Sequence, residues 1–274
     1  TSDTDFIHRV IATYKFNDDA LVYATVSRGF RPGGVNRRGT LPPYQADFID
    51  NYELGFKTSW FDNRMRLNAA LYQLDWTDIQ LSFLGANGLT EIRNAGNARI
   101  RGAEMDLYAN PLPGLIFSVG ASYNDAKITE DFCLIANSLF DCTIPGADGT
   151  PNELLAPAGT RLPISPKWKA TSLARYEFPI GSFVGHVQGS LTYEGDRNRD
   201  LRLVERETIG NLPDYTTVDA SIGIKSDTWS AELFAKNLFD TLGRTGNLVP
   251  CLETVCGDPD GVTAIGPKIY TYVI

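Results

Sequence analysis

The sequence predicts an all-β protein, an up-and-down antiparallel β-barrel that crosses a membrane. Three observations lead to this fold class. Apolar and polar residues alternate with a period of two, short and long connections alternate along the chain, and several apolar faces end in an aromatic residue. The 274 residues contain no run of ~18 apolar residues, so no transmembrane helix is predicted. A transmembrane strand needs only ~9–11 residues.

The alternation is clearest in residues 52–60, where Leu54 and Phe56 share one face and Glu53 and Lys57 share the other. Successive side chains of a strand point to opposite faces, so such a segment has one apolar and one polar face. The segments of this kind predict about eleven strands, at residues 6–16, 20–28, 48–60, 64–81, 89–109, 115–128, 166–177, 183–194, 214–225, 229–236 and 268–274.

Aromatic residues stand near the ends of several apolar faces. They are Trp60, Tyr123, Trp168, Tyr176, Phe178, Phe183, Tyr193 and Trp229. A soluble sandwich places large aromatics in the middle of its core, whereas a membrane barrel places them at the two boundaries between water and lipid. The charges on the opposite faces also argue against a sandwich core. We therefore expect a polar lumen, and Trp76 is expected in the outer aromatic girdle.

The connections between these segments alternate in length. The short ones lie at residues 17–19, 61–63, 110–114, 178–182 and 226–228, and the long ones at 29–47, 82–92, 129–160, 195–212 and 237–262. Outer-membrane barrels have short periplasmic turns and longer extracellular loops. The expected location is therefore the bacterial outer membrane, crossed many times.

An open sheet of this size would leave two unpaired edges in lipid. Each bare N–H or C=O group there costs several kcal/mol. Residues 1–274 are therefore expected to be the C-terminal portion of one transmembrane barrel domain, with an N-terminal half of the barrel missing from the chain.

Five stretches carry a family resemblance. They read VYATVSRGFRPGGVN at 22–36, YELGFKTSWFDNRMRLNAALYQLDWTDIQ at 52–80, NAGNARIRGAEMDL at 94–107, LPDY at 212–215 and NLFD at 237–240. In this order they resemble the C-terminal barrel half of a TonB-dependent outer-membrane receptor of the siderophore-receptor kind. The resemblance implies a barrel of roughly 22 strands around a plug domain, with the plug absent from this chain.

The same resemblance implies the partners. These are the TonB complex, contacted through the missing N-terminal region, a ferric siderophore or similar small ligand, and the lipid and lipopolysaccharide of the outer membrane. Chains of this family usually end in a strand that closes on an aromatic residue, whereas this chain ends at Tyr272, Val273 and Ile274. We therefore also expect the C-terminus to be truncated.

Arginines gather around the first long loop, at Arg28, Arg31, Arg37 and Arg38. One hypothesis is an electropositive mouth that binds an anionic ligand such as a ferric siderophore. The other is a solvated loop, in which Arg28 pairs with the polar lumen or with lipopolysaccharide phosphates. Arg28, Arg31 and Arg37 remain ligand-binding candidates, joined by Tyr44 as an aromatic residue on the same rim.

The four cysteines fall in pairs, with Cys133 and Cys142 in one long loop and Cys251 and Cys256 in another. Four cysteines allow three pairings. Pairing within each loop is the simplest, because each pair closes a short ring on an oxidising surface. A metal site is the rival interpretation, but neither of the two histidines lies near the cysteines. We expect two disulfides that stiffen loops.

Composition and motifs argue against other functions. The net charge of -8 and pI near 4.9 do not suit a nucleic-acid-binding protein. No Gly-rich phosphate loop, Cys-x-x-Cys pair or His-Glu-x-x-His motif is present, so neither an enzyme nor a cofactor is predicted. A polar lumen explains the alternating acidic residues Glu53, Glu104, Asp106, Asp219 and Glu232. The leading interpretation is an energised receptor that imports a scarce ligand, and the alternatives are a passive porin and a soluble sandwich.

Overall fold

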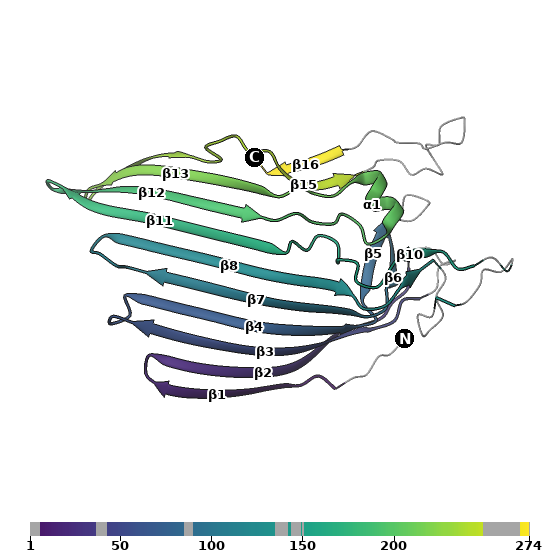
Figure 1. Ribbon diagram of the computed structural model, residues 1–274. Helices are drawn as coiled ribbons and strands as arrows, with labels where there is room; N and C mark the ends of the chain where they lie inside the picture. Colours follow the sequence, from purple (N-terminus) through teal and green to yellow (C-terminus); the bar gives the residue numbers. More distant parts are fainter. Residues whose placement is uncertain are drawn as a thin grey trace.

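A computed structural model describes residues 6–36, 43–84, 90–134, 142–143, 149, 151–248 and 269–273. Within these residues, one antiparallel sheet of ten strands dominates the molecule, and its strands follow one another side by side (Figure 1). Its strands in order are β1 (Arg9–Asn17), β2 (Ala20–Arg31), β3 (Asp47–Trp60), β4 (Met65–Thr77), β7 (Ala98–Ala109), β8 (Leu115–Ile128), β11 (Trp168–Ile180), β12 (Phe183–Glu194), β13 (Tyr215–Lys225) and β14 (Ser230–Ala235).

Smaller elements occupy the long connections. They are the pairs β5 (Gln80–Leu84) with β6 (Thr90–Asn94), β9 (Phe132–Cys133) with β10 (Leu154–Ala156) and β15 (Gly243–Leu248) with β16 (Ile269–Val273), and the helix α1 (Leu203–Ile209). Figure 1 shows β5, β6, β10 and α1 gathered at one end of the sheet, which we call the rim. The short turns lie at the opposite end.

Two of the predicted strands are broken in the structure. The segment predicted as one strand at 64–81 divides into β4 and β5 at Asp78, whose φ is 56°. The segment predicted at 89–109 divides into β6 and β7 near Gly96, whose φ is 71°. A residue with positive φ does not continue a strand, so the chain leaves the sheet and forms the β5–β6 hairpin on the rim.

The last predicted strand also pairs differently from the meander. It corresponds to β16, which pairs with β15 rather than with the ten-stranded sheet. The loops predicted at 195–212 and 237–262 contain α1 and β15, respectively. The meander itself and its short turns agree with the prediction.

The outer face of the sheet is apolar and exposed. Leu54, Leu71 and Ile222 on this face expose 54%, 61% and 55% of their surface. Apolar side chains at this exposure suit lipid rather than water, because contiguous apolar patches on soluble monomers are small. The predicted aromatic residues pair at two levels, with Tyr123 against Trp168 on the rim side and Phe183 against Trp229 near the short turns.

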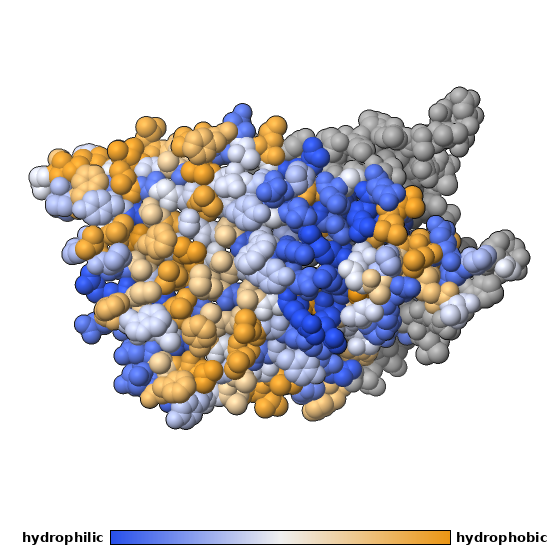
Figure 2. Space-filling model, in the orientation of Figure 1, coloured by the Kyte–Doolittle hydropathy of each residue, from blue (hydrophilic) through white to orange (hydrophobic). Residues whose placement is uncertain are grey.

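Where the strands approach the rim, polar residues take the outer positions and apolar residues take the inner ones. On β7 the outer positions change from Met105 and Ala103 to Arg101 and Arg99, while the inner positions change from Glu104 to Ile100. The register brings the same change to β4 and β8. Figure 2 shows the result on the outer face as a hydrophilic band that crosses the strands beside an apolar zone.

Buried apolar side chains gather at the rim, on the inner side of the strands. We call this cluster the rim core; it comprises Ile79, Phe83, Ala95, Ala98, Ile100, Ala126, Ile128, Phe132, Ala156, Leu162 and Leu201. Strand ends of β7 and β8 supply one side of it, and the β5–β6 hairpin and the long loops supply the other.

β1 and β14 form opposite edges of the described sheet and do not pair with each other, so the sheet does not close into a barrel within these residues. The described residues contain no helix that is both long and apolar enough to span a bilayer.

Candidate functional site

The rim is organised around Asp47, the first residue of β3, whose side chain is 2% exposed. Its carboxylate accepts hydrogen bonds from the Arg31 guanidinium, from Trp76 Nε1 at 3.0 Å and from the backbone N–H of Gln80 at 3.0 Å. The Arg31 guanidinium also lies over the Trp76 ring, 5.1 Å from its centroid. A buried carboxylate is stable only when it is paired in this way. Asp47 therefore ties β2, β4 and β5 together.

A second polar contact fastens the β5–β6 hairpin. Asn94 Nδ2 donates to the backbone oxygens of Asp78 at 2.6 Å and Gln45 at 3.1 Å, and Asn94 Oδ1 accepts from the Gln45 N–H at 2.8 Å. Asn36 bonds both backbone groups of Ile92 at 2.8 and 3.0 Å. These amides replace backbone ladder bonds where the chain leaves the sheet, so the loops at the mouth are held to the strands.

Carboxyl groups on the rim have raised pKa values. Burial raises the pKa of Asp78, and the nearby carboxylates of Glu130 and Asp47 raise it further. Burial also raises the pKa of Glu205 in α1, against the opposing effect of the Arg202 guanidinium, which lies 2.6 Å away. The rim is thus a partly dehydrated surface that already contains several negative charges.

The structure separates the ligand-binding candidates predicted from the sequence. Arg28 lies on the outer face, where it pairs with Asp50 at 3.7 Å. Arg31 lies on the inner face and is held by Asp47. Tyr44 forms an isolated bridge with Gly34, and its ring covers that glycine. Arg37 lies outside the described residues.

Trp76 is a correction to the sequence analysis. It was expected in the outer aromatic girdle, but it lies on the inner face and packs against the rim core. Its indole N–H needs a hydrogen-bond partner when buried, and Asp47 provides one.

Cys133 and Cys142 form a disulfide, with their Cα atoms 5.6 Å apart. The bond joins β9 to the loop that follows it, beside the rim core residue Phe132. Cys251 and Cys256 lie outside the described residues. Where the chain is described, no group of three or more His, Cys, Asp or Glu side chains is placed to hold a metal ion.

The inner face below the rim is a polar wall. Tyr23 donates its hydroxyl to Glu53 Oε1 at 2.6 Å, and further along the sheet His186 Nε2 lies 3.3 Å from Glu232 Oε1. Together with Glu104 these residues alternate with the apolar outer positions of the same strands. The wall offers hydrogen bonds and charge to a polar filling or to water.

A family model described as "TonB dependent receptor-like, beta-barrel" matches residues 1–238. The chain belongs to this family of TonB-dependent receptor β-barrels. It is a family of receptors and transporters rather than of enzymes.

Individual relatives support the same placement. The pesticin receptor of Yersinia enterocolitica is 25% identical over 89% of this chain and 33% of its own length. The ferric-pyoverdine receptor PbuA of Pseudomonas sp. strain M114 is 24% identical over 85% of this chain and 26% of its own length. The chain therefore spans about a third or less of the curated relatives it matches.

Solved structures share the fold at lower identity. The ferric yersiniabactin uptake receptor FyuA from Yersinia pestis superposes with a TM-score of 0.67 at 22% identity, covering 88% of this chain and 33% of FyuA. The pyoverdine outer membrane receptor FpvA of Pseudomonas aeruginosa gives a TM-score of 0.57 at 18% identity, covering 88% of this chain and 32% of FpvA.

Sequence reasoning missed the anchoring residues of the rim. Asp47 was placed in a loop, whereas it begins β3. Asn94 was correctly placed in a strand, but its role in holding the hairpin was not predicted. The phase reversal along residues 98–109 and 115–128 was the available signal, because it marks where the outer face leaves lipid and the inner face gains an apolar core.

Proposed function

We propose that this chain is the C-terminal portion of the barrel of a TonB-dependent outer-membrane receptor, and that the complete protein imports a ferric siderophore. The observation that carries the proposal is the family match over residues 1–238, on a sheet with an apolar outer face and a polar inner face. The edges left by β1 and β14 support a larger barrel, because unpaired backbone groups are costly in lipid.

The names of the relatives support an iron chelate as the cargo. PbuA is named as a ferric-pyoverdine receptor and FyuA as a ferric yersiniabactin uptake receptor. The polar wall of Glu53, Glu104 and Glu232 suits a plug domain that fills the lumen, and the TonB complex is proposed to move this plug and open a path. The family assignment supports this energised mechanism over a passive porin.

The rim supplies the proposed binding surface. Arg31 exposes half of its side chain beside Asp47, and Tyr44 lies on the neighbouring loop, so these two are the described candidates for contact with an anionic chelate. Arg37 enters as a candidate from the sequence alone. The Cys133–Cys142 disulfide, and a second one between Cys251 and Cys256, are proposed to stiffen loops around this surface.

Uptake of radioactive iron tests the proposal. The full-length receptor would be expressed in a Gram-negative host without siderophore receptors of its own and offered ferric pyoverdine, ferric yersiniabactin and a ferric catecholate. We expect saturable uptake of at least one chelate that disappears when TonB is deleted. Uptake that persists without TonB would instead identify a passive channel, and absence of uptake for every iron chelate would reject the cargo.

Substitution of Tyr44 tests the binding surface. Tyr44→Ala should weaken chelate binding about tenfold, since a single buried aromatic contact is worth that much. Tyr44→Phe keeps the ring and serves as the matched control. Equal binding by the alanine variant would remove Tyr44 from the site.

A further inference from the structure

The polar wall on the inner face divides into two parts of different chemistry. The part on β2, β3, β4 and β7, which we call the charged part, carries long ionisable side chains. They are Glu53, Lys57, Arg66, Glu104 and Asp106. Aromatic rings hold two of these cations, since Lys57 Nζ lies 5.9 Å from the centroid of the Tyr23 ring and the Arg66 guanidinium lies 4.9 Å from that of Tyr108. This part of the wall is therefore occupied by bulky and charged groups.

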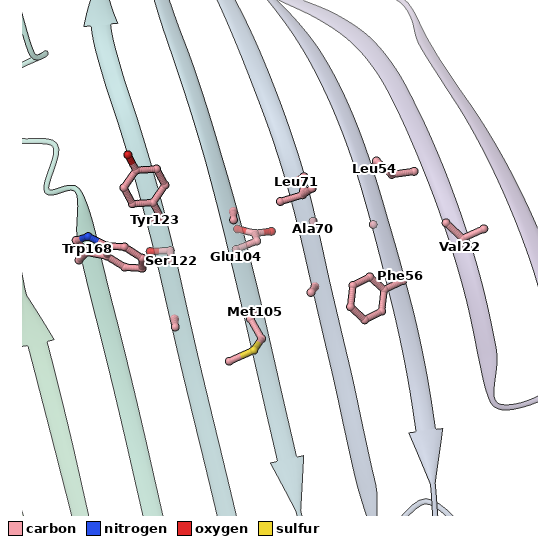
Figure 3. A pocket seen from close by; sticks show the side chains of 14 residues that line it. Val22, Leu54, Phe56, Ala70, Leu71, Glu104, Met105, Ser122, Tyr123 and Trp168 are labelled. Carbon is pink, nitrogen blue, oxygen red and sulfur yellow. The ribbon is translucent and has the colours of Figure 1, made fainter.

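Short and neutral side chains line the other part, on β8, β11, β12 and β13. We call it the hydroxyl strip; it comprises Ser118, Gly120, Ser122, Thr171, Ser190, Thr192 and Thr217. The register aligns Gly120, Thr171, Thr192 and Thr217 in one row across these four strands. The strip begins between β7 and β8, where Glu104 and Ser122 are register partners on neighbouring strands (Figure 3).

The row towards the short turns contains two exceptions to this chemistry. They are Leu173 on β11 and Asp219 on β13, which are register partners of Ser190 on β12. The Asp219 carboxylate accepts a hydrogen bond from the Asn237 N–H at 2.8 Å. Its charge is thus partly compensated by the backbone.

The wall is hollowed where the charged part meets the hydroxyl strip. One recess of about 390 Å³ and another of about 220 Å³ adjoin Gly120, and Asp106 and Thr171 line both of them. Gly120 has no Cβ atom; one placed there would lie 3.1 Å from Thr171 Oγ1 and 3.3 Å from Asp106 Oδ1. Thr171 and Thr192 are exposed on the inner face. The short side chains therefore leave free space along this side of the lumen.

Charged groups at the rim end of the strip hold one another. Glu194 Oε1 lies 2.7 Å from Arg197 Nη1 and 3.8 Å from Lys169 Nζ, and Glu194 Oε2 accepts the Tyr215 hydroxyl at 3.0 Å. One carboxylate is thus shared by two cations and a hydroxyl. The approach to the strip from the rim carries a small positive excess, which suits an anionic chelate.

We infer that the ferric chelate crosses the lumen between the plug and the hydroxyl strip. This inference rests on the proposed transport function. Transit requires binding that is favourable enough to enter and weak enough to leave. Hydroxyl groups both donate and accept hydrogen bonds, so they can exchange water for the oxygen atoms of a chelate at little net cost. The carboxylates and cations of the charged part would instead repel a charged chelate or retain it.

Bulky substitutions on the strip test this path in the full-length receptor, expressed in a host without siderophore receptors of its own. Thr171→Trp and Thr192→Trp each place a large ring in the aligned row. For the chelate that the unchanged receptor transports, among ferric pyoverdine, ferric yersiniabactin and a ferric catecholate, we expect the maximal uptake rate of radioactive iron to fall about tenfold. Chelate binding at the surface of cells without TonB should stay unchanged, because the substitutions lie below the rim.

Thr13→Trp is the matched control. Thr13 lies on the inner face of β1 as the register partner of Tyr23, and it is exposed like Thr171 and Thr192. The same substitution on this side of the lumen should leave uptake and surface binding unchanged. An equal loss of uptake in Thr13→Trp would show that the whole lumen is narrow, and it would overturn the inference.

Surface binding also separates a blocked path from a misfolded receptor. A variant that binds the chelate at the surface is folded, and the two strip variants lie on different strands, so either one suffices for the test. Unchanged uptake in a strip variant that binds the chelate would overturn the path while the transport proposal stands. If the unchanged receptor transports no iron chelate, the transport proposal is rejected and the path is rejected with it.

Discussion

The two halves of β7 and β8 place their apolar residues on opposite faces. We call the half beside the short turns the membrane half and the half beside the rim core the rim half. In the membrane half of β7 and β8, apolar residues such as Met105 point outward and polar residues such as Glu104 point inward. In the rim half, Arg99 and Lys127 point outward while Ile100 and Ile128 are buried inside. The strands continue without a bulge between the two halves.

This difference shows that the surroundings, rather than the strand itself, set the face that is apolar. In the outer membrane, where we propose that the complete protein lies, lipid surrounds the outer face in one half, so the apolar side chains lie outside and need no core. Water surrounds the outer face in the other half, so the apolar side chains lie on the inner face and form the rim core, as in a soluble protein. The change takes place between Ala103 and Arg101, which marks the boundary of the apolar zone.

Loss of Asp47 is expected to give the largest effect and to act on the rim alone. Asp47→Ala leaves Arg31, Trp76 Nε1 and the Gln80 N–H without their acceptor, which should lower the local stability of the rim by about 4 kcal/mol. Hydrogen exchange should accelerate in β5 and β6 and remain slow in the membrane half.

The matched control for Asp47 is Asp50 on the outer face of the same strand. Its side chain is 28% exposed and its pair with Arg28 spans 3.7 Å, so Asp50→Ala should cost less than about 1 kcal/mol. Equal exchange rates in the two variants would contradict the role of Asp47 as the anchor of the rim.

A charge in the membrane half should act through lipid. Met105→Arg places a guanidinium near the middle of the apolar zone and should cost about 2 to 4 kcal/mol of folding free energy, measured by denaturant titration in lipid vesicles. Ser118→Arg on the inner face of β8 is the control, since it faces the lumen and should cost much less. A similar loss in both variants would mean that the two faces are not in different solvents.

The sequence predicted the membrane half better than the rim. Alternation in residues 52–60 and 115–123 follows from lipid on one side and a polar lumen on the other, so strand position and facing could be read directly. The break at Asp78 could not, because its backbone accepts a hydrogen bond from the Asn94 side chain and donates one to the Asn97 side chain, and both residues lie farther along the chain. The exchange of polar and apolar residues between the two faces at Arg101 was visible in the sequence. It was overlooked because residues 89–109 were treated as one strand.

Gly102 lies on the inner face at the level where the pattern reverses, and it tests packing there. A Cβ atom at Gly102 would meet the Tyr72 ring and would lie 2.7 Å from the Tyr123 carbonyl oxygen, which belongs to the backbone and cannot yield. Gly102→Ala should therefore cost about 2 kcal/mol in denaturant titration. Gly189→Ala is the control, because its nearest neighbour, the Asp219 carbonyl oxygen, is 4.0 Å away. Equal stability of the two variants would mean that the Tyr72 ring does not pack tightly against Gly102 of β7.

The smallest expected effect is that of Asp78, and it depends on pH. Because burial and nearby carboxylates raise its pKa above the ordinary 3.8, the folded rim binds the proton more tightly than the unfolded chain. The stability from this group is full below pH 3.8 and is lost as pH rises through the raised pKa. Asp78→Asn removes the charge and tolerates the positive φ, so at pH 7 it should stabilise the rim by less than about 1 kcal/mol.

The pH dependence separates this electrostatic effect from a backbone effect. The advantage of Asp78→Asn in hydrogen exchange of β5 and β6 should shrink as the pH falls towards 3.8. Asp62→Asn makes the same exchange at φ 55° in the exposed turn at the opposite end of the sheet, and it controls for the backbone. If hydrogen exchange in β5 and β6 stayed equally slowed by Asp78→Asn at low pH, the effect would come from the backbone. The charge of Asp78 would then play no part in the stability of the rim.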